Sequence, residues 1–334
     1  MPLNTAATTL WIDTDTGSDD AVALVMAFQA ADIEIAGISV VAGNCPLEKA
    51  LQNALYTREL CAATHVPVYA GLAVPLIRQP FHAEDVHGED GMGDIGLPLH
   101  GRFADEGHAI DRMIEAILAR PGAVTLVTLG PLTNIAVALA REPRLARAVK
   151  HCVIMGGIGE GPGNVTPAAE FNIYADPDAA RIVFQSGMPI VMCGWEISAR
   201  HAVVEPADTA ELKHIGGAIG AFCVDIQRCL VEFATKVSGL PGIDLPDPIT
   251  MAIALDPGIV TQSSEAHVEV VNADGPALGQ TIVDRKRHDG RPANATVIDA
   301  ASHEGFMAML RAAVRKPVPP ASAPSDHGSP PALH

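Results

Sequence analysis

The sequence predicts an α/β fold: one open, mostly parallel, Rossmann-like sheet with helices on both faces and an active site at the carboxyl ends of the strands. Three observations predict this class. Short apolar runs alternate with helical patterns between Thr9 and Cys193, which is typical of parallel strands joined by helices. Of the 334 residues, 48% are hydrophobic and 18% are charged, a composition that allows a large core. Polar segments follow several predicted strands, where such sheets bind ligands.

The strands and helices can be placed in order along the chain. Each predicted strand is a short apolar run, and each predicted helix has apolar residues at helical spacing. Pro46 stands near the start of the second helix, where a first-turn proline is favoured. The predicted strands are residues 9–13, 33–41, 66–69, 124–129, 151–155 and 189–193, and the predicted helices are residues 18–31, 46–63, 109–119, 132–140 and 178–185.

Four polar segments follow predicted strands, at residues 13–20, 43–44, 129–130 and from 156 onwards. Because the carboxyl ends of parallel strands lie along one edge of the sheet, we expect these segments to converge. Residues 73–107 form a long loop rich in Gly, His and Asp, and a loop of that length inside a compact domain is usually functional.

The composition of the chain indicates its domain organisation and excludes some classes of partner. We expect one domain over residues 1–315 and a disordered Pro- and Ser-rich tail over residues 316–334. The net charge of −17 argues against nucleic acid or an anionic membrane as the main partner. The six cysteines form no CxxC pair and the N-terminal segment has no secretory pattern, so reduced thiols and a cytoplasmic location are expected.

An acidic cluster near the N-terminus is the strongest chemical signal. Asp13, Asp15, Asp19 and Asp20 lie within eight residues, at the end of a predicted strand and in the first turn of the next helix. Like charges at such short range are unfavourable unless a cation binds among them, and a hard cation with oxygen ligands is the natural partner. A solvent-exposed acidic helix cap is the alternative, but a cap rarely needs four aspartates.

Two enzyme families share part of this pattern. Asp13, Asp15 and Thr16 after an apolar strand resemble phosphatases of the haloacid-dehalogenase type, in which the first aspartate would attack phosphorus. The longer segment DTDTGSDDA resembles the opening motif of the calcium-dependent, inosine-uridine preferring nucleoside hydrolases. Further segments resemble that family in its order, and they are VAGN (41–44), HGEDGMG (87–93), VTLGPLTNIAVAL (127–139), MGGIGEGPGN (155–164), AEFNIYADPDAA (169–180) and LPDPITMAIALDP (245–257).

The resemblance covers about residues 11–311 and implies an enzyme that hydrolyses the N-glycosidic bond of ribonucleosides to ribose and free base. Such reactions pass through an oxocarbenium-like transition state. The implied cofactor is Ca²⁺, whose bound water would be activated by Asp15 as catalytic base. The implied partner is a small-molecule nucleoside, and the implied assembly is a homodimer or homotetramer.

The site residues implied by motif position fall into two groups. The implied metal ligands are Asp15, Asp20, the main-chain carbonyl of Leu129, and Asp247. The implied substrate contacts are Asp19, Asn44, Asn164, Glu170 and Asn172, with His87 as a contact to base or sugar.

Several neighbouring residues have structural interpretations. Asp13 is expected behind the metal site rather than in it. Asn134 is expected to cap the helix that follows Pro131. Gly156 and Gly157 should allow a tight turn. Glu170 and Asn172 are expected on the same side of an extended segment.

One position departs from the family pattern. Many members carry a histidine, the general acid for the leaving base, immediately before the last metal aspartate, and this chain has Pro246 there. Proline cannot supply a side-chain proton, so three options stay open. Another side chain of the loop at residues 225–244 could protonate the base, an aromatic could stack on it, or the base could leave without strong acid help. The candidates are Asp225, Arg228 and Lys236 for the acid, and Trp195 and Phe233 for stacking.

Trp195 is more simply interpreted as a packed aromatic at a strand end. Because the acid is missing, a protein that binds ribosides without hydrolysing them is the alternative function from a different class.

Overall fold

The computed structural model of the protein describes residues 8–288 and 290–315, and the predicted tail at 316–334 lies outside the described residues. Within them, nine strands form one sheet in the order β10-β9-β11-β6-β5-β4-β1-β2-β3. Only β9 runs against its neighbours, β10 and β11, which confirms the predicted open, mostly parallel sheet. The strands are β1 Thr8–Thr14, β2 Ile33–Val40, β3 Val68–Ala70, β4 Val124–Thr128, β5 His151–Met155, β6 Ile190–Cys193, β9 Val260–Val270, β10 Thr281–Asp284 and β11 Ala295–Ala301.

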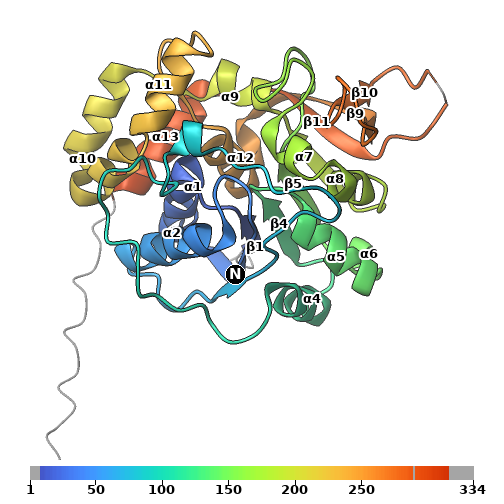
Figure 1. Ribbon diagram of the computed structural model, residues 1–334, viewed down its shortest axis with the longest axis horizontal. Coiled ribbons are helices and arrows are strands. Elements are labelled where there is room, and N and C mark those ends of the chain that lie inside the picture. The colour runs from blue at the N-terminus through green and yellow to red at the C-terminus, as the bar shows by residue number, and fades with distance from the viewer. Residues whose placement is uncertain (1–7, 289, 316–334) are drawn as a thin grey trace, which may run out of the picture.

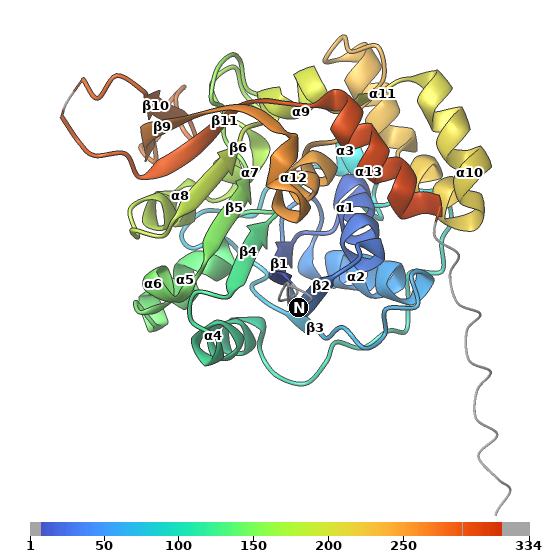
Figure 2. The same ribbon diagram turned by 180° about the vertical axis from the view of Figure 1, so that it is seen from behind.

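Helices cover both faces of this sheet, as Figures 1 and 2 show from opposite sides. One layer contains α1 Ser18–Gln29, α2 Leu47–Leu60, α9 Trp195–His201, α12 Pro246–Leu255 and α13 His303–Arg315. The other layer contains α4 Ala109–Ala119, α5 Thr133–Arg141, α6 Leu145–Ala148 and α8 Pro177–Phe184.

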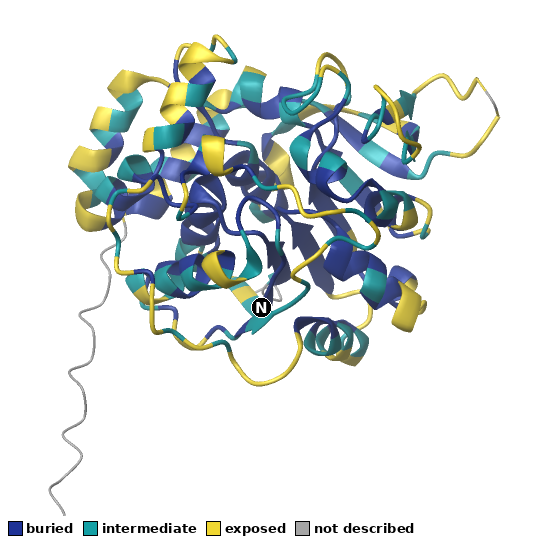
Figure 3. Cartoon of the chain, in the orientation of Figure 1, coloured by how far each residue is buried: buried dark blue, intermediate teal, exposed yellow. Residues whose placement is uncertain are grey.

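The strand residues alternate between the two layers because successive side chains of a strand point to opposite faces. In β1, Leu10 and Ile12 belong to the core under α1 and α12, whereas Trp11 belongs to the core under α4 and α5. All three are at most 1% exposed. Figure 3 shows the result: the sheet is buried, and the exposed residues concentrate on outer helices and loops.

A smaller group of elements covers the carboxyl edge of the sheet (Figure 1). It consists of α3 Glu84–His87, α7 Phe171–Ala175, α11 Arg228–Lys236 and the two-stranded sheet of β7 Val203–Val204 and β8 Ile243–Asp244. Helix α10 Pro206–Asp225 packs against α13 and α1 instead. Helix α11 packs against α3 and β8. These elements, drawn from distant parts of the chain, enclose the region where the polar segments meet.

The elements predicted between residues 9 and 193 are confirmed, with small shifts at their ends. Residues 73–107 form the expected loop, interrupted by the short helix α3. The expectation of a loop at residues 225–244 was wrong, because these residues contain α11. Leu230, Phe233 and Ala234 recur at helical spacing on its apolar face, which favours a helix packed over the neighbouring elements.

The remaining expectations on the chain as a whole concern thiols and membranes. All six cysteines are free, in agreement with the expected reduced thiols. Among the described residues, none of the helices is long and apolar enough to cross a membrane.

Candidate active site

The polar segments that follow the strands converge at the carboxyl edge of the sheet, as predicted. Asp15 follows β1, Asn44 follows β2, Leu129 follows β4 and Trp195 follows β6. A cavity of about 370 Å³ lies above them. It is lined, among others, by Asp19, Asn44, His87, Leu129, Asn164, Glu170, Asn172 and Asp247, so eight of the ten predicted site residues reach its wall.

The two other predicted residues, Asp15 and Asp20, lie in the acidic cluster at the floor of the cavity. Asp15 and Asp20 are fully buried, Asp19 is 4% exposed and Asp247 is 3% exposed. One carboxylate oxygen from each of Asp19, Asp20 and Asp247 lies within 4.8 Å of the others. Asp20 and Asp247 stand in the first turns of α1 and α12, where a helix favours negative charge.

The turn after β1 holds Asp20 firmly in place. Its Oδ1 accepts a hydrogen bond from Thr14 Oγ1 at 2.6 Å. Its Oδ2 accepts hydrogen bonds from the Gly17 N–H at 2.9 Å and from Asn44 Nδ2 at 3.0 Å. Asn44 therefore supports the acidic cluster as well as lining the cavity.

Asp15 is packed between two glycine backbones. Its Oδ2 accepts a hydrogen bond from the Asn44 N–H at 2.6 Å. A Cβ atom at Gly130 would stand 2.6 Å from Asp15 Oδ1, and Gly43 approaches the same carboxylate from the other side. Residues with side chains could not occupy these two positions without displacing the carboxylate.

The electrostatics of the cluster favour a bound cation. Burial raises the pKa of Asp15, Asp19 and Asp247 well above the ordinary range, and the neighbouring carboxylates raise each pKa further. Among the described residues, the buried oxygens Asp15 Oδ1 and Asp19 Oδ1 have no hydrogen-bond partner. Several buried carboxylates with unpaired oxygens are the donor set that a hard divalent cation takes, so the residues present fit Ca²⁺.

Glu170 corrects one sequence expectation. Its own backbone is extended, but the helix α7 starts directly after it and includes Asn172. Glu170 is the N-cap of α7, and its carboxylate accepts hydrogen bonds from the N–H groups of Asn172 at 2.7 Å and Ile173 at 3.1 Å. The Gly157 N–H donates to it as well, at 2.8 Å, from a backbone with φ of +77° in the expected tight turn. Burial raises the pKa of Glu170 to about 7.

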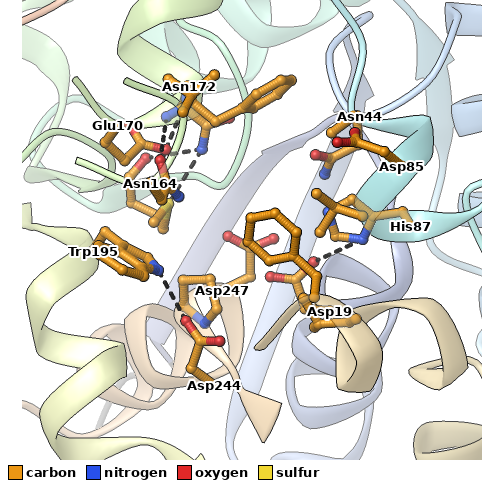
Figure 4. A pocket seen from close by; sticks show the side chains of 18 of the residues that line it. Asp19, Asn44, Asp85, His87, Asn164, Glu170, Asn172, Trp195, Asp244 and Asp247 are labelled. Carbon is orange, nitrogen blue, oxygen red and sulfur yellow. Dashed lines mark hydrogen bonds and ion pairs between the residues drawn. The ribbon is translucent and has the colours of Figure 1, made fainter. Parts of the chain in front are cut away.

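The helical start of α7 also aims Asn172 at the end of β4. Asn172 Nδ2 donates a hydrogen bond to the Leu129 carbonyl at 2.6 Å. Asn164 lies on the same side of the cavity, where its Oδ1 accepts a hydrogen bond from the Phe171 N–H at 3.0 Å (Figure 4). Asn164, Glu170 and Asn172 thus form one polar wall opposite Asn44 and His87.

His87 lies at the end of α3, beside the start of α1. Its Nδ1 is 3.0 Å from Ser18 Oγ and 3.7 Å from Asp19 Oδ1, a contact visible in Figure 4. Burial lowers the pKa of His87 to about 4, so the ring is neutral at pH 7.

Asp13 lies behind the cavity and does not line it. It is fully buried and accepts hydrogen bonds from Ser39 Oγ and, at 2.8 Å, from Asn134 Nδ2. Burial raises the pKa of Asp13 to about 7. Asn134 does not cap its helix, contrary to expectation: its Oδ1 accepts from the Leu72 N–H at 3.0 Å. An interior position for Asp13 disfavours a phosphatase that uses it as the nucleophile.

The acids proposed for the leaving base lie away from the cavity. Asp225 forms an ion pair with Lys213, and Lys236 forms one with Glu232. Arg228 donates a hydrogen bond to the Asp94 carbonyl. None of the three candidates lines the cavity. Both aromatic candidates, Trp195 and Phe233, do line it.

Sequence reasoning missed Asp244. Trp195 Nε1 donates a hydrogen bond to Asp244 Oδ2 at 2.8 Å, and both side chains line the cavity (Figure 4). The available signal was its position three residues before Asp247, directly before the segment LPDPITMAIALDP. Burial raises the pKa of Asp244, while the hydrogen bonds from Trp195 and Ser198 lower it.

Known proteins with the same sequence pattern and fold share this arrangement of elements. The sequence matches the family described as inosine-uridine preferring nucleoside hydrolase over residues 10–308. A pyrimidine-specific ribonucleoside hydrolase of Escherichia coli (strain SE11) is 39% identical over 306 residues, which cover 91% of this chain and 96% of that protein.

Solved structures agree with the sequence comparison. A plant nucleoside hydrolase superposes with a TM-score of 0.88 at 30% identity, over 93% of this chain and 100% of that one. A purine-preferring ribonucleoside hydrolase from Gardnerella vaginalis superposes with a TM-score of 0.84 at 30% identity, over 92% of this chain and 99% of that one. Of the three functions considered from the sequence, these relatives therefore support a hydrolase, and they do not support a phosphatase or a non-hydrolytic riboside-binding protein. The chain belongs to the nucleoside hydrolase family, whose members split ribonucleosides into ribose and free base.

Proposed function

We propose that the chain holds Ca²⁺ through Asp15, Asp20, the main-chain carbonyl of Leu129, and Asp247, and that Asp15 is the general base of ribonucleoside hydrolysis. The observation that carries this proposal is the burial of these carboxylates together, with Asp15 Oδ1 lacking a hydrogen-bond partner among the described residues. The Leu129 carbonyl already accepts from Asn172, but a carbonyl oxygen has a second lone pair for a cation.

The cation, when bound, would supply positive charge that makes a water more acidic and that attracts ribose hydroxyls. Asp15 would do the proton transfer. Its Oδ2 is held by the Asn44 N–H, so its Oδ1 is the atom left to accept a proton from the attacking water. A base held by one fixed hydrogen bond keeps its orientation towards the reacting atom.

The polar wall would bind the sugar. Asn164 and Glu170 line the cavity on the side that faces Asp19, and we assign them, with Asp19, Asn44 and Asn172, to the ribose hydroxyls. His87 is assigned to the same substrate as a neutral contact, because burial keeps its pKa low. The developing positive charge of the sugar ring would be stabilised by these buried carboxylates.

The test is ribose release from a panel of nucleosides, with the metal removed by chelation and Ca²⁺ then restored. We expect activity to disappear and to return. Asp15→Asn should lower kcat by roughly 10²- to 10⁴-fold, the usual contribution of a general base. Asp111→Asn, an exposed carboxylate on α4 that pairs with Arg141, is the matched control and should keep full activity. Retention of more than a tenth of kcat by Asp15→Asn would contradict the assigned base.

The expected assembly, a homodimer or homotetramer, and the expected cytoplasmic location stay predictions. Light scattering after size-exclusion chromatography measures the first.

A further inference from the structure

The cavity has two chemically different halves. Asn164, Glu170 and Asn172 form the polar wall assigned above to ribose. The other half of the lining, which contains Trp195 beside Asn164 (Figure 4), consists of apolar and aromatic side chains from α9, α11 and the residues around them, namely Trp195, Leu230, Phe233, Val237 and Pro246. An apolar, aromatic wall suits the flat face of a nucleobase, so a nucleoside whose ribose contacts the polar wall would place its base here.

Asp244 is the buried carboxylate that lines this apolar half of the cavity, among the residues that the structure describes. It ends β8, and it is only 4% exposed. Asp85, another carboxylate of the cavity lining, is exposed on α3. A buried carboxylate beside apolar side chains is costly unless donors satisfy both of its oxygens.

The two side-chain donors around Asp244 share one of its oxygens. Trp195 Nε1 donates to Oδ2 at 2.8 Å, and Ser198 Oγ donates to the same atom at 3.3 Å. Figure 4 shows the second oxygen directed away from Trp195, to the side of the cavity where Asp247 and Asp19 lie. Asp244 is therefore oriented by two side-chain donors and by its own backbone N–H, and neither side-chain donor occupies Oδ1, the oxygen that faces the cavity.

We propose that Asp244 determines base specificity: its Oδ1 accepts a hydrogen bond from an amino group of the nucleobase. A carboxylate oxygen attracts an amino group and repels a carbonyl oxygen. The enzyme should therefore prefer nucleosides with an amino-bearing base, such as cytidine or adenosine, over those with a carbonyl at that position, such as uridine or inosine. The inference rests on the ribose placement proposed above.

The experiment compares kcat/KM for cytidine and uridine, and for adenosine and inosine, in the Ca²⁺-loaded enzyme. We expect the wild type to favour the amino member of the pair it hydrolyses by roughly 10- to 100-fold, the value of a hydrogen bond to a charged group. Asp244→Asn should move that ratio towards the carbonyl member by at least tenfold, because the amide can donate to a carbonyl. A wild-type preference for the carbonyl member, or an unchanged ratio in the variant, would overturn the proposal.

p-Nitrophenyl riboside separates this inference from the proposed function, because its leaving group has neither an amino group nor a ring N–H. Metal-dependent ribose release from it by the wild type tests the proposed function alone. If Asp244→Asn lowers kcat/KM by the same factor for all substrates, Asp244 acts in folding or in sugar binding, and base recognition is refuted.

Trp195→Phe keeps the test decisive if Asp244→Asn does not fold. The phenyl ring preserves an aromatic wall but removes the Nε1 donor that orients Asp244. In Trp195→Phe, the ratio of kcat/KM for the amino member to kcat/KM for the carbonyl member should fall, by a smaller factor than in Asp244→Asn. An unchanged ratio would count against the proposal. Asp225→Asn, at the outer end of α10 and paired with Lys213, is the matched control and should leave the ratio at the wild-type value.

Discussion

Glu170 has two roles at the scale of a single residue. Its carboxylate caps α7 by accepting two backbone hydrogen bonds from that helix, accepts a third from the Gly157 N–H, and also lines the cavity. Despite these donors, burial raises its pKa to about 7 from an ordinary value of 4.5, because removal from water penalises the charged form. The residue that we assign to the ribose is thus also a source of pH-dependent stability.

Between pH 4.5 and pH 7, native Glu170 holds a proton that the unfolded chain has released. The native state binds more protons in this window, so its free energy of unfolding must fall as the pH rises. Glu170→Gln removes this contribution. We expect wild type to lose about 2 kcal/mol relative to the variant between pH 5 and pH 7.5.

Denaturant unfolding in the presence of a chelator measures this difference. Glu48→Gln, at an exposed position near the start of α2, is the control and should follow wild type. Identical pH dependence in wild type and Glu170→Gln would show that the native carboxyl ionises normally.

Two other residues, Asn134 and Asp244, show where sequence patterns mislead at this scale. Asn134 stands where a helix cap is expected, but it donates to Asp13 and accepts from the Leu72 N–H. Asp244 is one acidic residue among 39, and only the packing of α9 beside β8 gives it an indole donor. Partners distant in the sequence therefore decided both roles.

At the scale of the element, α11 forms the wall of the cavity that is assigned to the base. Leu230 and Phe233 are three residues apart, and Val237 follows four residues later. This spacing places them on one helical face, and that face lines the cavity. Val231 lies on another face and is 36% exposed.

Truncation of that wall should weaken substrate binding. Phe233→Ala removes an aromatic surface for the base, and base–aromatic stacking contributes about 1–3 kcal/mol. We expect KM for nucleosides to rise roughly 5- to 100-fold, as measured by ribose release at varied substrate concentration. Val231→Ala, from the same helix but outside the cavity lining, should leave KM near the wild-type value. Equal effects of the two substitutions would mean that α11 acts only through its own stability.

At the scale of the whole molecule, the acidic cluster joins segments from the two ends of the chain. Asp15 and Asp20 come from the turn after β1 and from α1, and Asp247 comes from α12, which packs against α1. The mutual repulsion of these carboxylates opposes that packing, and a cation bound among them would reverse the effect. Metal binding should therefore stabilise the fold as well as serve catalysis.

Ca²⁺ at about 100 times its Kd should stabilise the folded state by about 2.7 kcal/mol. For a domain of this size, we expect a rise in Tm of about 5 °C, measured by thermal unfolding with chelator and with Ca²⁺. Asp247→Ala removes one ligand and should abolish most of the rise, whereas Asp111→Asn should retain it. A Tm that is independent of Ca²⁺ in wild type would contradict the proposed metal site.

The sequence by itself determined the fold class, the order of the elements up to β6, and the segments that carry the chemistry. It could do so because apolar periodicity and short motifs are local properties, and because parallel strands bring their carboxyl ends to one edge. Tertiary structure alone decided the helical cap formed by Glu170, the position of α11 over the cavity, and the pairing of Asp244 with Trp195. These features depend on which distant side chains meet in a buried space, and burial then sets their charge and hydrogen bonding.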